Sequence, residues 1–214
     1  MSQTDTAANA TASAERRRWN ATDLGLIAVF AALVAGSALV PGISANVFGI
    51  PITFQTLAVM LTGLMLGAGR GFAAVGLYTL LGLAGLPIFS QGRSGLVILA
   101  GPSAGYIIAF PIAAAVVGWL ATLVIRRTSR ARTLWLFAAA TVTSIVVVHS
   151  LGIAGIVLNT KAPLGQAFMA DLVFYPGDVI KNIFAAVIAV ALHRAFPDLL
   201  VRRVKLDAAK RHNP

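Results

Sequence analysis

The placement of charge is the feature that most constrains how this chain folds. No Asp, Glu, Lys or Arg occurs in residues 24–69, 94–125 or 133–160. A helix that spans the hydrocarbon core of a bilayer needs about 20 mostly apolar residues, and each of these stretches is longer than that. Charged residues make up 11% of the chain, against roughly 25% in soluble domains. The pattern indicates a helical membrane protein with several spans.

The apolar runs predict six transmembrane helices, separated by segments rich in Gly, Pro or basic residues. Their approximate bounds are 24–40, 51–66, 72–83, 101–125, 134–158 and 176–196. We expect Thr22 or Asp23 to cap the first helix, and residues 67–71 to form a tight turn after the second. Residues 84–95 contain too much Gly and Pro for a regular helix, so a loop that folds back into the protein is expected there. Residues 159–171 are expected to form another loop.

Six spans place all the basic clusters on one side of the membrane, whereas five or seven would divide them. These clusters are Arg16–Arg18, Arg70, Arg126–Arg132 and Arg202–Arg211. Because basic loops stay on the cytoplasmic side, the predicted fold is an all-α integral membrane protein with six transmembrane helices and both termini cytoplasmic. The net charge of +10 then reflects orientation and contact with anionic lipid headgroups, and does not predict nucleic acid as a partner.

The chain is predicted to hold one domain, residues 21–197, between two polar ends. Residues 1–20 are expected to be a disordered basic segment, and residues 198–214 a basic cytoplasmic tail. Arg16-Arg17 before the first apolar run also fits a twin-arginine export signal. The further spans that follow favour an interfacial anchor instead.

The stretch Phe174–Lys181 opens the last apolar run and places two ionisable residues at membrane depth. Asp178 and Lys181 are three residues apart, so a helix would present them on one face. Ionisable side chains inside a membrane are costly and usually face protein or a water-filled cavity. Two interpretations remain open: an ion pair that holds the bundle together, or a site that binds a polar ligand.

Several further residues are expected near this pair, because the topology brings the loop before the second span and the loop before the fourth to the same outer face. Hydrogen bonds are expected from Thr53, Gln55, Gln91, Tyr106 and Tyr175, and close approach of a helix or ligand at Gly105. Phe54, Phe89 and Phe174 would supply apolar walls. An apolar pocket with a few polar groups is typical of small-molecule sites.

An enzyme is the alternative function. Residues 92–95 match the GxSG pattern of intramembrane serine proteases, with Ser94 as nucleophile and His149 as the base on a helix. Against this, Ser94 is expected on a loop, and a lone histidine in an apolar run is more often a packed, hydrogen-bonded residue than a catalytic base, which favours that interpretation of His149. The chain has no cysteine, no phosphate-binding GxxxxGK[ST] and no cluster of metal ligands, so neither a cofactor nor a metal is predicted.

The first span carries small residues at helical spacing, among them Ala28, Ala32 and Ala35. Small residues let helix backbones approach closely. The spacing alone favours packing inside the protein over a docking face for a partner.

Four motifs, taken in order, resemble the BioY family, the biotin-specific substrate-binding subunits of energy-coupling-factor transporters. They are Pro51-Ile52-Thr53-Phe54-Gln55-Thr56, the Gly- and Leu-rich segment Tyr78 to Pro87, Gly101-Pro102 with Gly105-Tyr106, and Phe174 through Lys181 as F-x-P-G-D-x-x-K. The resemblance covers about residues 24–196.

The resemblance implies a protein of the bacterial inner membrane that takes up biotin and is not an enzyme. Its partners would be a transmembrane coupling subunit and two ATPase subunits. It also implies that the stripe of Ala28, Ala32 and Ala35 faces the coupling subunit, that the loop before the fourth span is a lid, and that Asp178 and Lys181 contact biotin.

Overall fold

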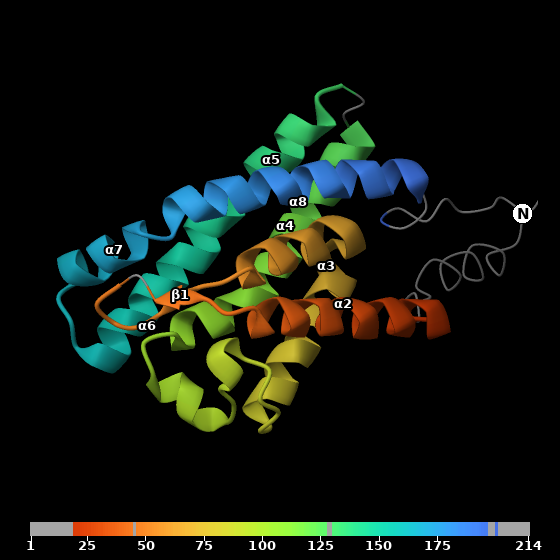
Figure 1. Ribbon diagram of the computed structural model, residues 1–214. Helices are drawn as coiled ribbons and strands as arrows, with labels where there is room; N and C mark the ends of the chain where they lie inside the picture. Colours follow the sequence, from red (N-terminus) through yellow and green to blue (C-terminus); the bar gives the residue numbers. More distant parts are fainter. Residues whose placement is uncertain (1–18, 45, 128–129, 197–199, 201–214) are drawn as a thin grey trace, which may run out of the picture.

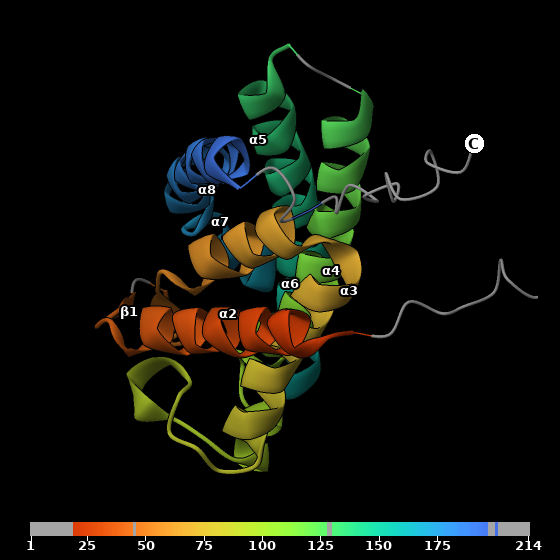
Figure 2. The ribbon, with the colours of Figure 1, turned by 90° about the vertical axis from the view of Figure 1, so that its right-hand side faces the viewer.

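The computed structural model describes residues 19–44, 46–127, 130–196 and 200, and most of them are helical. Figures 1 and 2 show the arrangement of these elements from two directions. In chain order they are α2 (Ala21–Leu39), β1 (Ile43–Ser44), β2 (Pro51–Ile52), α3 (Gln55–Leu83), η1 (Ser90–Gly92), η2 (Leu96–Ala100), α4 (Ala104–Arg127), α5 (Arg132–Thr143), the π-helix η3 (Ser144–His149), α6 (Ser150–Thr160), α7 (Leu164–Leu172) and α8 (Tyr175–Ala195).

Helix α2 starts one turn earlier than its apolar run. Asn20 is the N-cap, and it forms a capping box with Asp23, so the expectation of Thr22 or Asp23 as the cap was wrong. A side-chain oxygen of Asn20 accepts the backbone N–H of Asp23 at 3.0 Å, and the Asp23 carboxylate accepts the N–H of Asn20 at 3.1 Å. These bonds satisfy N–H groups that a helix end leaves without partners.

The second and third predicted spans form the single element α3, which is broken at one residue. Gly67 has φ +78°, a backbone conformation that favours glycine, whereas residues 68–71 are helical and not the expected tight turn. A Cβ on Gly71 would lie only 3.2 Å from the Cα of Gly63. Residues eight apart in a straight helix are separated by about 12 Å, so the chain folds back on itself at Gly67.

The segment from Arg132 to Thr160 is one continuous helical path, in which η3 joins α5 to α6. A π-helix bonds at i→i+5, and such segments are frequent at functional sites. After Lys161 the chain forms α7, where the sequence had indicated a loop. Its residues Ala167, Ala170 and Asp171 are buried, so packing of one face stabilises this short helix.

The loop between α3 and α4 is irregular, as its Gly and Pro content predicts, but it is anchored. The backbone N–H of Gly95 donates to the carbonyl of Gly82 at 2.8 Å, and that of Phe89 donates to the carbonyl of Arg93 at 3.1 Å. The Phe89 ring packs on Gly82 so closely that a Cβ there would overlap it. The loop therefore lies against α3.

The two ends of the bundle differ. The hairpin end carries β1, β2, α7 and the first turns of α8, on the left of Figure 1. The kink end carries the start of α2, the break at Gly67 and the last turns of α8. There Arg70 pairs with Asp23 at 3.1 Å, and a ring nitrogen of His193 bonds the carbonyl oxygen of Leu64 at 3.0 Å.

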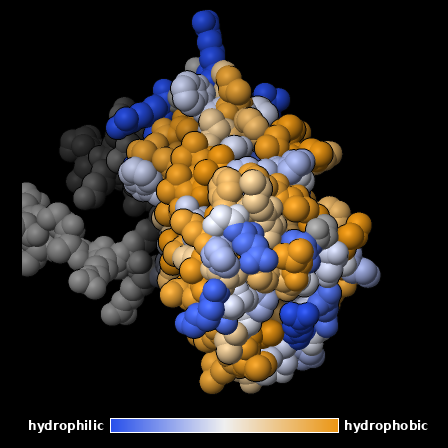
Figure 3. Space-filling view, turned by 90° about the vertical axis from the view of Figure 1, so that its left-hand side faces the viewer, coloured by the Kyte–Doolittle hydropathy of each residue, from blue (hydrophilic) through white to orange (hydrophobic). Residues whose placement is uncertain are grey.

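Large apolar side chains are exposed on every long helix, as contact with lipid requires. Examples are Val29, Leu80, Trp119, Val146 and Phe184. Figure 3 views the hairpin end, where polar residues gather in the centre and lower part of the face and apolar residues cover much of the rest. Within the described residues, five helices are long and apolar enough to cross a membrane, with α3 counted once and residues 132–160 as one helix.

The prediction of a helical membrane fold is confirmed, with the addition of the two-residue strands β1 and β2. The count of six spans and the cytoplasmic location of both termini stay predictions. The predicted N-terminal segment and C-terminal tail fall almost entirely on residues 1–18 and 197–214, of which only Leu200 is described.

Candidate functional site

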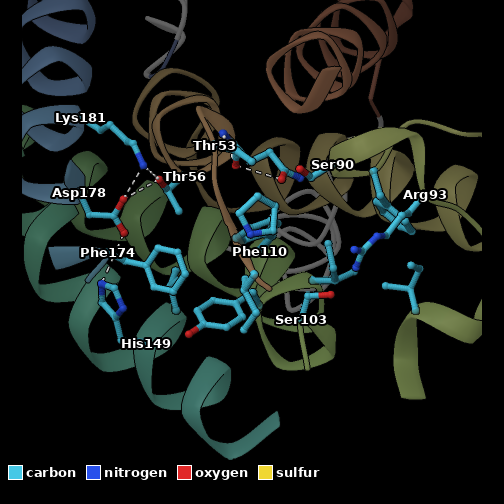
Figure 4. Close-up of a pocket in the computed structure, with 18 residues that line it drawn as sticks. Thr53, Thr56, Ser90, Arg93, Ser103, Phe110, His149, Phe174, Asp178 and Lys181 are labelled. Carbon is cyan, nitrogen blue, oxygen red and sulfur yellow. Dashed lines mark hydrogen bonds and ion pairs between the residues drawn. The ribbon is translucent and has the colours of Figure 1, made fainter. Parts of the chain in front are cut away.

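A cavity opens among five segments that meet near the hairpin end (Figure 4). The empty space among its lining residues is about 670 Å³ when the open mouth is included. Most of its lining is apolar. The lining residues are Ile50, Pro51, Thr53, Gln55, Thr56, Phe89, Ser90, Arg93, Ile98, Ser103, Tyr106, Ile107, Phe110, Val148, His149, Phe174, Asp178 and Lys181.

One wall of the cavity holds a trio of polar side chains. Lys181 Nζ donates to Asp178 Oδ1 at 2.8 Å and to Thr56 Oγ1 at 3.2 Å, and the Thr56 hydroxyl donates to the same Asp178 oxygen at 2.9 Å. Asp178 and Lys181 are both buried, at 4% and 8% exposure. Burial strengthens such charge-assisted hydrogen bonds.

The second carboxylate oxygen of Asp178, Oδ2, is arranged differently. Within the described residues its polar neighbour is the ring nitrogen Nε2 of His149, at the longer distance of 3.5 Å. Oδ1 therefore accepts two hydrogen bonds, whereas Oδ2 retains capacity to accept a bond from a ligand.

The start of α8 places this wall. Pro176 occupies the first turn, where a missing backbone N–H costs nothing, and Asp178 follows in the same turn. The helix dipole favours a carboxylate at this position. Lys181 lies one turn later on the same face, as the spacing of three residues predicts.

A second layer lies behind Asp178 and consists of His149, Asp171, Tyr106 and Tyr175. Asp171 Oδ1 accepts a hydrogen bond from the Tyr106 hydroxyl at 2.6 Å and lies 3.0 Å from His149 Nδ1. The rings of His149 and Tyr175 stack, with centroids 4.2 Å apart. The π-helix ends at His149 and brings its ring between the two carboxylates.

A third polar group lies at the start of α3. The Gln55 amide donates to the Tyr78 hydroxyl at 2.6 Å, and the Thr53 hydroxyl donates to the Gln55 carbonyl at 3.1 Å. The Tyr78 ring meets Phe89 edge to face at 5.5 Å. These contacts fix the cavity wall formed by Phe89, so the loop between α3 and α4 contributes an ordered surface.

The opposite side of the cavity carries Arg93, with Ser103 beside it (Figure 4). Ser90 lies on the same loop, and its hydroxyl is buried without a hydrogen-bond partner in the described part of the chain. The cavity thus has a cation at either side, Lys181 and Arg93, with apolar surface between.

The structure brings five of the eight predicted binding residues to the cavity: Thr53, Gln55, Tyr106, Asp178 and Lys181. The other three lie elsewhere. The Gln91 side chain is exposed and reaches Ser44 at 3.4 Å. Gly105 packs against the backbone of Leu151 and Gly155 in α6, where any Cβ would overlap, so it serves helix packing. Tyr175 stacks on His149 without lining the cavity.

Six polar residues at the site were not predicted as binding residues from the sequence: Thr56, Ser90, Arg93, Ser103, His149 and Asp171. Thr56 had a usable signal, since it follows Gln55 at the start of a helix and faces α8. Arg93 is an isolated charge within a Gly-rich loop. His149 and Asp171 are 22 residues apart, and no sequence pattern links them.

The proposed hydrolase pair does not form. Both ring nitrogens of His149 face carboxylates, Asp171 at Nδ1 and Asp178 at Nε2. Ser94 lies outside the cavity, on the loop. A base whose two nitrogens are directed to carboxylates is not placed to activate this serine.

Comparison with known proteins decides the family. Residues 9–198 match the BioY family. The chain belongs to the BioY family. It is 40% identical to the biotin transporter BioY of Rhizobium etli, with 84% of this chain and 97% of the relative aligned. It is 37% identical to that of Rhodobacter capsulatus, with 83% and 96% aligned.

The fold also matches a solved structure, the crystal structure of the S-component for biotin from an ECF-type ABC transporter. The TM-score is 0.75 at 29% identity, covering 81% of this chain and 91% of the other. The family resemblance drawn from the four motifs is therefore confirmed. This BioY-family chain belongs among transporters and not among enzymes, and the comparisons give no support to a serine hydrolase.

Proposed function

We propose that this chain is a high-affinity biotin-binding membrane subunit of a vitamin uptake transporter, which captures biotin at the outer face. The observation that carries the proposal is the free accepting capacity of Asp178 Oδ2 beside the Lys181 ammonium at the cavity wall. The names of the relatives support biotin as the ligand.

The chemistry of biotin fits the cavity. Its ureido ring presents two N–H donors beside a carbonyl oxygen. Asp178 Oδ2 accepts from an N–H, while Lys181 donates to the carbonyl oxygen, and both bonds are charge-assisted. Phe89, Phe110 and Phe174 enclose the apolar part of the molecule. Arg93, across the cavity, then pairs with the biotin carboxylate.

Biotin enters from outside the cell in the proposed topology. The two halves of α3 count as separate spans, which gives six, and the basic kink end faces the cytoplasm. Both termini are cytoplasmic, in the inner membrane of a bacterium. The hairpin end then faces outward, and the loop between α3 and α4 closes the cavity mouth as a lid.

Transport requires partners, proposed to be a transmembrane coupling subunit and two ATPase subunits. The buried face of α2 is formed by Ile27, Ala31, Val34 and Ala38. Ala28 and Ala32 are exposed on the opposite face, Ala35 is half-buried beside them, and a Cβ at Gly25 or Gly36 would touch nothing. The stripe of small residues is thus free to contact the coupling subunit.

Replacement of Ala32 by Arg tests the docking face. The variant is expected to bind biotin normally and to fail to co-purify with the coupling subunit, since a long charged side chain prevents close helix approach. Leu33→Arg, an exposed position on the same helix that is turned away from Ala28 and Ala32, is the control. Co-purification of Ala32→Arg at the parent level would contradict this docking face.

Titration of biotin into the purified chain tests the function itself. Isothermal titration in detergent should show saturable binding with unmodified biotin recovered afterwards. Biotin methyl ester should bind more weakly, because its neutral end no longer pairs with Arg93. Absence of saturable biotin binding by folded protein would overturn the proposal.

A further inference from the structure

We propose that Asp171 and His149 are positioning residues, which together hold the Asp178 carboxylate in the state that receives the ligand. Neither the family match nor the names of the relatives assigns a role to these residues. The inference rests on the proposed function, because it concerns how Asp178 is prepared to bind biotin.

The geometry is a chain of ionisable groups drawn from three elements. Asp171 on α7 lies 3.0 Å from His149 Nδ1, and His149 Nε2 lies 3.5 Å from Asp178 Oδ2. Asp178 in turn lies 2.8 Å from Lys181. Carboxylate, imidazole, carboxylate and ammonium therefore follow one another toward the cavity, and Figure 4 shows the link from His149 to Asp178.

Asp171 and His149, the first two groups in this series, are deeply buried. Asp171 has 0% exposure and His149 has 2%. A buried charge is costly unless it is paired and hydrogen-bonded. Among the described residues the recorded polar partners of Asp171 are the Tyr106 hydroxyl and His149, and its Oδ2 has no hydrogen bond. His149 is the cation available to balance it.

The charges around His149 are the basis of its proposed role. Two carboxylates and one ammonium leave one negative charge, which a protonated imidazole would balance. Both ring nitrogens face acceptor oxygens, which is the arrangement that two N–H donors satisfy. The other titratable groups facing this ring, Tyr106 through Asp171 and Tyr175 by stacking, bring no positive charge. A stacked aromatic ring also favours a cation.

The consequence for the site is that Asp171, which lies outside the cavity, influences Asp178, which lines it. Asp171 does not line the cavity. It fixes the orientation and charge of His149, and the imidazolium in turn holds the Asp178 carboxylate through Nε2, which lies 3.5 Å from Oδ2. Asp171 therefore acts on biotin affinity through His149.

Asp171→Asn separates this role from simple packing. Asparagine has nearly the same shape, and its carbonyl oxygen still accepts from Tyr106 and His149, so the charge is lost while an NH2 group replaces Oδ2, which has no hydrogen bond within the described residues. A merely structural role predicts unchanged affinity for biotin in a folded protein. The positioning role predicts a loss of about tenfold, within the range of measured coupling between neighbouring groups. Asp23→Asn at the kink end is the matched control, expected to leave affinity unchanged.

A double-mutant cycle tests the route. In a His149→Gln background, Asp171→Asn should cause no further loss of biotin affinity, because the group through which Asp171 acts is gone. Equal losses in both backgrounds would overturn the inference, as would unchanged affinity in Asp171→Asn. If the folded parent chain binds no biotin, the proposed function fails and the inference fails with it. If the parent binds and only the cycle fails, the inference alone is lost.

A spectroscopic measurement covers the case in which the variants fail to fold. Nitrogen-15 NMR of the histidine-labelled parent chain at neutral pH reports whether each ring nitrogen carries a proton. His193→Gln and His212→Gln identify the remaining signals as His149. Two protonated nitrogens on His149 are expected, and an unprotonated Nε2 would overturn the inference.

Discussion

Two buried ion pairs lie at opposite ends of this molecule, and they are built differently. At the kink end, Asp23 accepts Arg70 at Oδ1 and the backbone N–H of Asn20 at Oδ2, so both oxygens are used. At the hairpin end, Asp178 lines a cavity, accepts hydrogen bonds from Lys181 and Thr56 at Oδ1, and has only the 3.5 Å contact with His149 Nε2 at Oδ2 within the described residues. The two carboxylates are similarly buried, with exposed fractions of 2% for Asp23 and 4% for Asp178.

The comparison shows that burial of a charge does not by itself identify a site. The Asp23–Arg70 pair closes the gap between α2 and the second half of α3, and the carboxylate also completes a capping box. The Asp178–Lys181 pair joins residues of one helix, where three intervening peptide units already fix their separation. The Asp178–Lys181 contact itself joins no separate elements, and Oδ2 keeps accepting capacity beyond its long contact with His149, so this pair is better suited to a ligand than to stability.

Lys181→Ala should have the largest effect of the substitutions that compare the two ends. Loss of the ammonium removes a donor to the ligand and leaves Asp178 with Thr56 as its remaining partner at Oδ1. We expect a loss of at least about tenfold in biotin affinity, since a hydrogen bond to a charged group is worth about 1.5–3 kcal/mol. Isothermal titration measures it, with Arg194→Ala, exposed at the kink end, as control. Parent-level affinity in Lys181→Ala would remove the functional difference between the pairs.

Gly82→Ala should have an intermediate effect on biotin affinity, because it displaces a residue of the cavity wall. The new methyl group overlaps the Phe89 ring, so that ring and the loop that carries it must shift. A loss of about fivefold in biotin affinity is expected, which corresponds to about 1 kcal/mol, the low end of the typical cost of overpacking. Gly76→Ala is a matched control on the same helix, since its Cβ would meet nothing within 4 Å. Equal affinities in the two variants would show that the loop does not shape the site.

Asp23→Asn should affect stability and spare binding. It weakens the link between α2 and α3, and loss of about 2 kcal/mol would lower the melting temperature by about 5 °C in a chain of this size. Thermal unfolding followed by fluorescence gives the shift, and titration gives the affinity, which should match the parent. A lower biotin affinity without a lower melting temperature would reverse the assignment of the two ends.

Gln91→Ala should have the smallest effect. The side chain is exposed, lies outside the cavity and makes one long contact with Ser44. Affinity and melting temperature should both stay at parent values in the two assays above. A clear loss of biotin affinity would mean that the loop moves Gln91 into the cavity when the ligand binds.

Local chemistry made much of the fold predictable. The uncharged stretches located the long helices, and Pro176 with the spacing of Asp178 and Lys181 located one wall of the site. The break at Gly67 was recognisable from its glycines, but not its confinement to one residue, because packing between Gly63 and Gly71 decides how sharply the chain folds back. Helix α7 was missed because nine residues hold a helix only through tertiary contacts.

The unpredicted part of the site depends on contacts between distant residues. Gly105 has the small size that either a ligand or a helix requires, and only the position of α6 shows that it is the helix. His149 looked like a packed histidine within an apolar run, and Asp171 like a residue of a loop. Their pairing requires the π-helix and α7 to be in place, which no local pattern specifies.

Titration of biotin into the Asp178→Asn variant, beside the parent and Asp23→Asn, tests the central claim most directly. The substitution keeps the side chain's shape and removes the charge of the carboxylate that lines the cavity. The account predicts a loss of at least about tenfold in affinity for Asp178→Asn and none for Asp23→Asn, with Asp178→Asn still folded. Binding by Asp178→Asn equal to that of the parent would contradict the site.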